Sequence, residues 1–100
     1  MNLGISIKNL RQQKGIKQTS LAEMSGISQT YLSQIENNIK EPGISTLKTI
    51  ANNLGIPLPI IFFLSLENDD ILPEKRNAFK HLAPSINSMI SEFFINTTNN

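Results

Sequence analysis

Apolar residues recur three or four positions apart along most of the chain, in short segments that glycine or proline separates. This spacing is that of an amphipathic helix, and no segment alternates apolar and polar residues as a half-buried strand would. The pattern therefore predicts an all-α fold. Five short helices are expected in the first part of the chain, at about residues 5–14, 18–24, 28–37, 45–54 and 57–65.

The residues at the ends of these segments agree with the predicted helices. Gly15, Gly26 and Gly55 stand where helices commonly stop. Ser28 and Ser45 are suited to cap the third and fourth helices, because a serine oxygen accepts a hydrogen bond from a free N–H of the first turn.

The last third of the chain has a different pattern. Residues 67–72 are predicted to form a linker, followed by a C-terminal helical segment over residues 73–95 and a disordered tail over residues 96–100. Pro84 either kinks the helical segment or divides it in two. Its apolar stripe consists of Phe79, Ala83, Ile86, Ile90 and Phe93. The stripe must be covered, either by the chain's own domain or by a second copy, and we expect a homodimer interface.

Composition excludes most catalytic chemistry. The chain has no cysteine and a single histidine, His81, which rules out disulfides, thiolate metal sites and most catalytic triads. The adjacent Asp69 and Asp70 are more typical of a helix cap than of a metal site. We therefore expect no enzyme, no metal and no cofactor. No apolar run reaches the roughly 18 residues of a membrane span and no signal peptide is recognisable, which favours a cytoplasmic protein without a membrane partner.

The charges are distributed unevenly along the chain. Residues 1–60 carry a net charge of +3 and residues 61–100 one of −2, within a total of +1. A basic first part joined to an acidic second part suggests a division of labour, although an excess of this size also arises by chance.

The stretch from Gln18 to Asn37 is the most informative part of the sequence. Two predicted helices are joined there by a tight turn, with Gly26 at its bend and Ala22 four residues before it. A steep crossing of two helices through a short turn needs both, since glycine permits a positive φ and alanine lets the second helix approach the first. The pattern indicates a helix-turn-helix.

From about Ile7 to Phe63, the chain resembles the Cro/cI-type, phage-repressor-like helix-turn-helix proteins, also called the XRE family. The resemblance is carried by Leu10-Arg11, Gly15, Lys17-Gln18, Leu21-Ala22-Glu23, Ser25-Gly26-Ile27-Ser28, Tyr31-Leu32-Ser33-Gln34-Ile35-Glu36, Pro42, Ser45-Thr46-Leu47, Ile50-Ala51 and Leu54-Gly55-Ile56. It implies a five-helix, lambda-repressor-like DNA-binding domain over residues 1–66, with the third helix in the major groove of double-stranded DNA.

The third predicted helix has a polar face suited to reading bases. Tyr31, Leu32 and Ile35 define its buried side, and the N-terminal residues of such a helix reach the base edges. Glutamine can bond bidentately to adenine, and a threonine methyl can touch a thymine methyl. The predicted base contacts are Ser28, Gln29, Thr30, Ser33 and Gln34.

Contacts to the phosphate backbone are expected on both sides of this face. Gln18 opens the second helix, where its side chain and backbone N–H can meet a phosphate, and the resemblance implies the same role. The predicted phosphate contacts are Gln18, Lys17, Asn37, Asn38 and Lys40. The chain departs from the family here, because glycine is common at the position of Asn38 and a basic residue at that of Asn37. The affinity of one copy for DNA is therefore expected to be moderate, so that tight binding depends on a dimer.

The resemblance also implies a structural ion pair between Arg11 and Glu36, which would join the first and third helices. If it is partly buried, breaking it costs more than breaking an exposed pair. The alternative is a surface pair of little energetic value.

Together these features predict a sequence-specific DNA-binding transcription regulator. The simplest form is a homodimeric repressor on a pseudo-palindromic operator, in the cytoplasm with the nucleoid. The alternatives are an antitoxin whose C-terminal helix binds a toxin, and a helix-turn-helix scaffold for protein interaction. The uncharged, small polar face of the third helix argues against the scaffold.

Overall fold

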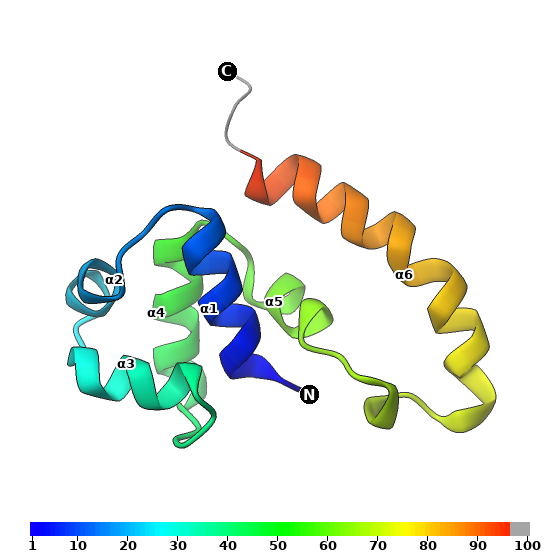
Figure 1. Cartoon of the computed structure of the whole chain (residues 1–100), viewed down its shortest axis with the longest axis horizontal. Helices are drawn as coiled ribbons and strands as arrows, with labels where there is room; N and C mark the ends of the chain where they lie inside the picture. The colour runs from blue at the N-terminus through cyan, green and yellow to red at the C-terminus, as the bar shows by residue number, and fades with distance from the viewer. Residues whose placement is uncertain (97–100) are drawn as a thin grey trace.

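The computed structural model describes residues 1–96 and confirms the all-α fold, since these residues form helices and no strand. The elements in chain order are α1 (Leu3–Gln13), α2 (Gln18–Met24), α3 (Gln29–Glu36), α4 (Ile44–Leu54), α5 (Leu58–Leu64), the 3-10 turns η1 (Asn68–Asp70) and η2 (Pro73–Lys75), α6 (Arg76–Ile90) and the π-helical turn η3 (Ser91–Ile95). We call residues 1–66, with α1 to α5, the five-helix unit, and residues 67–96 the C-terminal arm. In Figure 1 the five helices lie together, and the chain leaves them after α5 and returns along α6, whose C-terminal end lies nearest to them. Of the tail predicted over residues 96–100, residues 97–100 lie outside the described part.

The predicted helix stops are confirmed by the backbone. Gly15, Gly26 and Gly55 have φ angles of 70°, 71° and 73°, a left-handed conformation that glycine adopts without a steric cost. The predicted cap of the third helix is also present, because Ser28 Oγ accepts a hydrogen bond of 3.0 Å from the Tyr31 N–H. Local signals therefore fix the ends of most helices.

The predicted starts of two helices are wrong. The fourth helix begins at Ile44 with Gly43 as its N-cap, so Ser45 lies inside the first turn and caps nothing. The first helix begins earlier than expected, because the Asn2 side chain accepts a hydrogen bond of 3.2 Å from the Ile5 N–H and caps it.

The core of the molecule lies inside the five-helix unit. Its fully buried apolar residues come from all five helices and the turn after α4, and they are Ile7, Leu10, Leu21, Ala22, Leu32, Ile35, Leu47, Ile50, Ala51, Leu54, Ile56 and Ile61. Of the buried side predicted for the third helix, Leu32 and Ile35 are confirmed, whereas Tyr31 is only half-buried. Among residues 1–96 no single helix is long and apolar enough to span a membrane, and the apolar helices α4 and α5 are bent by 94° at their junction.

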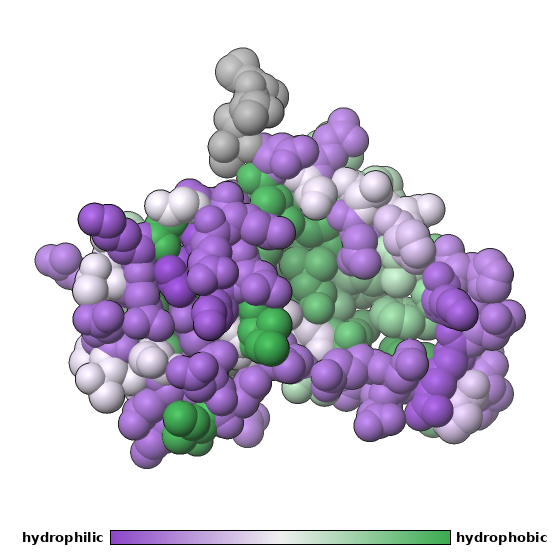
Figure 2. Space-filling model, viewed as in Figure 1, coloured by the Kyte–Doolittle hydropathy of each residue, from purple (hydrophilic) through white to green (hydrophobic). Residues whose placement is uncertain are grey.

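The C-terminal arm rests on this unit along one side of α6. Pro84 lies inside a single helix and does not divide it. The rings of Phe63 on α5 and Phe79 on α6 lie 6.0 Å apart at 56°, and Ile90 is 6% exposed. Apolar surface gathers in the recess between the two parts (Figure 2). The chain's own domain therefore covers part of the predicted stripe.

The five residues predicted to form a dimer interface do not share one environment. Phe79, Ala83 and Ile86 are half-buried, Ile90 is buried against its own chain, and Phe93 is 70% exposed. The outward apolar side of α6 and η3 is formed by Leu82, Met89 and Phe93. A dimer interface on α6 stays a prediction, and Ile90 is placed to hold the arm rather than a partner.

The start of the segment between α5 and α6 is held by the N-terminal residue of the chain. The Met1 ammonium forms ion pairs with Glu67 Oε1 at 3.0 Å and Asp70 Oδ2 at 2.7 Å. The hydrogen bond that the ammonium donates to Asp70, and then that to Glu67, raise the pKa of the ammonium, and the same bond lowers the pKa of the Asp70 carboxyl. Asp70 Oδ2 also accepts from the Glu67 N–H at 2.8 Å in a capping box at η1, so the capping role expected of Asp69 and Asp70 is found for Asp70 alone.

Candidate nucleic-acid interface

The turn between α2 and α3 is built as the sequence predicts. The Gly26 N–H donates to the Glu23 carbonyl at 3.1 Å, and the Ile27 N–H donates to the Ala22 carbonyl at 3.0 Å. Ala22 is 2% exposed, so its small side chain allows the two helices to approach. The position of α3 against α2 thus follows from local backbone geometry.

A second contact holds this turn against α4. Asn53 Nδ2 donates a hydrogen bond of 3.0 Å to Ser25 Oγ at the end of α2. Ser25 belongs to the motif but Asn53 does not, and the sequence did not indicate the bond because it joins positions far apart.

One face of α3 presents a polar hollow to solvent. The hollow has a volume of about 280 Å³ and is lined by Gln18, Gln29, Thr30, Ser33 and Gln34. The structure therefore brings four of the five predicted base-contact residues together with Gln18 from α2. Ser28, the fifth, stands at the N-cap, where its hydroxyl is used to cap α3.

A buried ion pair lies beneath this hollow. Arg11 Nε donates to Glu36 Oε2 at 2.7 Å and Arg11 Nη2 donates to Glu36 Oε1 at 3.1 Å, so the contact is bidentate. The two side chains are 10% and 1% exposed. Arg11 Nη1 also donates to the Ile16 carbonyl at 2.9 Å. The structure places the pair inside the unit between α1 and α3 and not on its surface.

The ion pair continues outward through two glutamines. Gln18 Nε2 donates to Glu36 Oε1 at 3.0 Å, and Gln29 Nε2 donates to Gln18 Oε1 at 3.2 Å. Because a carboxylate only accepts, Gln18 must turn its nitrogen inward and its oxygen toward Gln29. This fixes the amide of Gln29 in turn, with its oxygen and its second N–H left for an outside partner.

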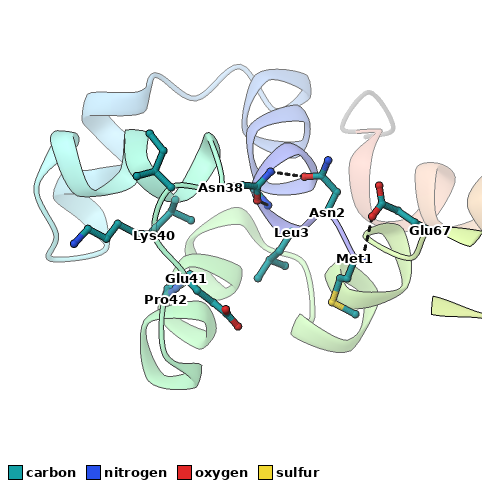
Figure 3. A pocket seen from close by; sticks show the side chains of 11 residues that line it. Met1, Asn2, Leu3, Asn38, Lys40, Glu41, Pro42 and Glu67 are labelled. Carbon is teal, nitrogen blue, oxygen red and sulfur yellow. Dashed lines mark hydrogen bonds and ion pairs between the residues drawn. The ribbon is translucent and has the colours of Figure 1, made fainter. Parts of the chain in front are cut away.

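The predicted phosphate contacts are placed unequally. Lys17, just before α2, and Lys40, after α3, are both exposed. Asn37 Nδ2 donates to the Ser33 carbonyl at 2.9 Å. Asn38 differs, because its side chain, although on an exposed residue, is hydrogen-bonded to the first turn of α1. It bonds to Asn2 in Figure 3, which also shows Lys40 at the edge of a pocket of about 570 Å³.

Gly4, a position that the sequence pattern did not indicate, determines how closely α3 packs on α1. A Cβ atom on Gly4 would lie 2.4 Å from the Ile35 carbonyl oxygen and 2.8 Å from that of Glu36. The first turn of α1 therefore lies directly on the last turn of α3, and only glycine leaves room. A lone glycine within a helical pattern often marks such a close approach of two backbones, and this was the available signal.

Comparisons with known proteins match this region. A family model described as Helix-turn-helix matches residues 7–61. The chain is 38% identical over 61 residues to an immunity repressor protein of Bacillus phage phi105, covering 61% of this chain and 42% of that protein. It is 42% identical over 59 residues to the ImmF control region 10 kDa protein of the same phage, covering 59% of this chain and 66% of that one. The chain thus spans less than two thirds of the length of either relative.

A solved structure agrees with these matches. SinR, described as the master regulator for biofilm formation and crystallised in complex with DNA, is 33% identical to the chain. The superposition covers 60% of this chain and 97% of that one, with a TM-score of 0.57.

Proposed function

Because the chain belongs to the helix-turn-helix (XRE) family, matched over residues 7–61, we propose that it binds double-stranded DNA sequence-specifically as a transcription regulator. The observation that carries the proposal is the hollow on α3, whose five lining side chains are all uncharged and polar. Such side chains suit hydrogen bonding to base edges, which a helix of this kind reaches from the major groove. The similarity to SinR, which was crystallised in complex with DNA, supports DNA binding.

Gln29 is proposed as the principal base contact. Its oxygen and one N–H remain for an outside partner once Gln18 has taken the other N–H. An amide with one acceptor and one donor facing outward matches the N6 and N7 atoms of adenine, which are a donor and an acceptor. Thr30, Ser33 and Gln34 line the same hollow and are proposed to read neighbouring positions.

Affinity for the DNA backbone is proposed to come from the exposed Lys17 and Lys40, with the backbone N–H groups at the start of α2 and the Asn37 side chain. Each lysine that neutralises a phosphate releases counterions, so binding weakens as salt rises. With few such cations, the protein depends on a second copy for tight binding.

The active form is proposed to be a homodimer that acts as a repressor. The name of the phage relative supports repression. The outward apolar side of α6 and η3 exposes three large side chains, with Leu82 at 56%, Met89 at 52% and Phe93 at 70%, and is the surface that we propose a second copy covers. Two copies joined there would present two α3 helices to half-sites roughly 34 Å apart on a pseudo-palindrome. Action on DNA places the protein in the cytoplasm with the nucleoid.

The test is a selection from a random duplex pool, followed by fluorescence anisotropy with the enriched duplex at two salt concentrations. We expect binding to weaken with salt, and Gln29→Ala to lose roughly 1–3 kcal/mol of preference at one base pair per half-site while binding other DNA as before. Gln13→Ala, an exposed glutamine on α1, is the matched control and should behave as wild type. Failure to enrich any sequence, with binding indifferent to Gln29, would refute the proposal.

A further inference from the structure

We propose that Asn38 is a positioning residue for DNA recognition, and that its side chain sets the angle of α3 by fastening the end of that helix to the first turn of α1. This inference rests on the function proposed above. It replaces the phosphate contact expected of Asn38 from the sequence.

Both polar atoms of the Asn38 side-chain amide form hydrogen bonds. Its Oδ1 accepts a hydrogen bond of 3.1 Å from the Gly4 N–H, and its Nδ2 donates one of 2.7 Å to Asn2 Oδ1 (Figure 3). Asn38 also has a φ of 60°, and it is the one residue other than glycine with a positive φ among those described. Asparagine adopts this left-handed conformation more readily than most residues with a Cβ, and its two hydrogen bonds hold it there.

The hydrogen-bond partners of Asn38 are themselves held in place by other contacts. Asn2 Oδ1 accepts from the Ile5 N–H at 3.2 Å and so caps α1, and the Asn2 N–H donates to the Ser65 carbonyl at 2.8 Å after α5. Gly4 touches the carbonyl of Ile35 on α3 so closely that a methyl group would not fit. Asn38 therefore ties α3 to a junction of α1 and α5.

The effect of this contact is greatest at the other end of α3. The helix runs from Gln29 to Glu36, so its reading end lies roughly 12 Å from the anchored end at 1.5 Å per residue. A tilt of about 5° at the anchored end moves the reading end by about 1 Å over that length. Binding residues have to be held within about 0.5 Å of their productive place, so a tilt of this size weakens base readout.

A phosphate contact by Asn38 would have a different signature. A contact to the DNA backbone adds to every sequence equally, whereas the angle of α3 affects only the sequence that its side chains read. The ratio of affinities for the selected and a scrambled duplex therefore separates the two roles. A role in folding alone would change neither affinity when the protein is fully folded.

The experiment compares wild type with Asn38→Gly, which keeps the left-handed conformation and removes the amide. Asn2→Ala removes the partner, Asn2→Asp keeps both accepted bonds, and Asn52→Ala on α4 controls for loss of an exposed amide. Affinities for the selected and scrambled duplexes are measured by anisotropy well below each melting temperature, with circular dichroism confirming the fold.

We expect Asn38→Gly and Asn2→Ala each to lower affinity for the selected duplex about tenfold, with affinity for the scrambled duplex changed less than about twofold. Asn2→Asp and Asn52→Ala should match wild type. An equal loss on both duplexes would overturn the inference in favour of a phosphate contact, and no loss on either would leave Asn38 a folding role only. If wild type itself prefers no sequence, the proposed function fails and this inference fails with it.

Discussion

The five-helix unit and the C-terminal arm are both helical, but they are stabilised in different ways. Twelve of the thirteen fully buried apolar residues among those described belong to the five-helix unit, and only Ile90 belongs to the arm. The unit thus has its own core. The arm depends on the Phe63–Phe79 contact between α5 and α6, and on Phe94 and Ile95 of η3, which pack against that core. It is also held by Arg76, whose Nε donates to the Asn68 and Ile71 carbonyls at 2.9 and 3.0 Å.

This difference suits the two tasks of the proposed function, which are reading DNA and pairing with a second copy. DNA readout needs side chains held in fixed places, and the buried Arg11–Glu36 pair and its two glutamines supply such a frame. Pairing of two copies needs an open apolar face, and the arm leaves Leu82, Met89 and Phe93 exposed. The two regions therefore carry separate parts of the proposed function.

The largest expected effect is on the ion pair inside the unit. Arg11→Ala leaves the nearly buried Glu36 carboxylate without its partner, which should lower the free energy of unfolding by about 3–5 kcal/mol. The corresponding change in the arm is Asp69→Ala, which breaks an exposed pair with Arg76 at 4.0 Å and should cost less than about 1 kcal/mol. Urea denaturation monitored by circular dichroism measures both changes in the free energy of unfolding. Equal changes would contradict the proposed difference between the two regions.

Core truncations should also separate the two regions. Ile35→Ala in the unit should lower global stability by about 2–5 kcal/mol. Ile90→Ala should instead release α6 locally, so that its amides exchange faster while those of α1 to α5 keep their protection within about 0.5 kcal/mol. Hydrogen exchange read by NMR gives both quantities. Global destabilisation by Ile90→Ala would mean that the arm and the unit form one cooperative structure.

A smaller effect is expected on the salt dependence of DNA binding. Lys40→Ala should reduce the slope of log affinity against log salt by about 0.9, the value of one phosphate contact, and weaken binding to all sequences alike. Lys80 on α6 is the matched control, and Lys80→Ala should leave the slope unchanged. A reduced slope with Lys80→Ala would place the arm at the DNA backbone.

The smallest effect concerns the joint between the two regions. The raised pKa of the Met1 ammonium means that its contribution to stability is present below its ordinary pKa and is lost as pH rises through the raised pKa, above about pH 8. The lowered pKa of Asp70 means that its contribution is present above its ordinary pKa and is lost as pH falls through the lowered pKa, below about pH 4.

Melting temperatures across this pH range test the joint. The difference between wild type and Asp70→Asn should be greatest near neutral pH and should shrink toward both extremes. Asp69→Asn, at an exposed carboxylate one residue away, is the control. A constant difference at all pH values would show that the ion pairs with Met1 contribute nothing.

The sequence was most informative where local signals act. Periodicity and glycine positions predicted the helices, and Ser28 predicted the start of α3, because caps and left-handed turns depend on neighbouring residues. The polar set at Gln29, Thr30, Ser33 and Gln34 was predicted to share one face and does line one hollow. Helical spacing alone brings such residues together.

Contacts between distant segments could not be predicted in the same way. Asn38 looked free to meet a phosphate, and its commitment to Asn2 and Gly4 depends on how α1 packs on α3. The stripe on α6 indicated that a face must be covered, but an amphipathic pattern does not say by what. Ile90 is buried within the chain itself, whereas Phe93 is left exposed.

The most direct test of this division is the number of half-sites in the DNA that each form of the protein selects. The full chain and a variant with Leu82→Glu and Phe93→Glu are each used to enrich duplexes from a random pool. We predict that the full chain enriches two copies of a half-site roughly one helical turn apart, and that the variant enriches the same half-site singly and more weakly. A changed half-site sequence in the variant, or paired half-sites that persist without these apolar residues, would contradict the separation of DNA readout from pairing.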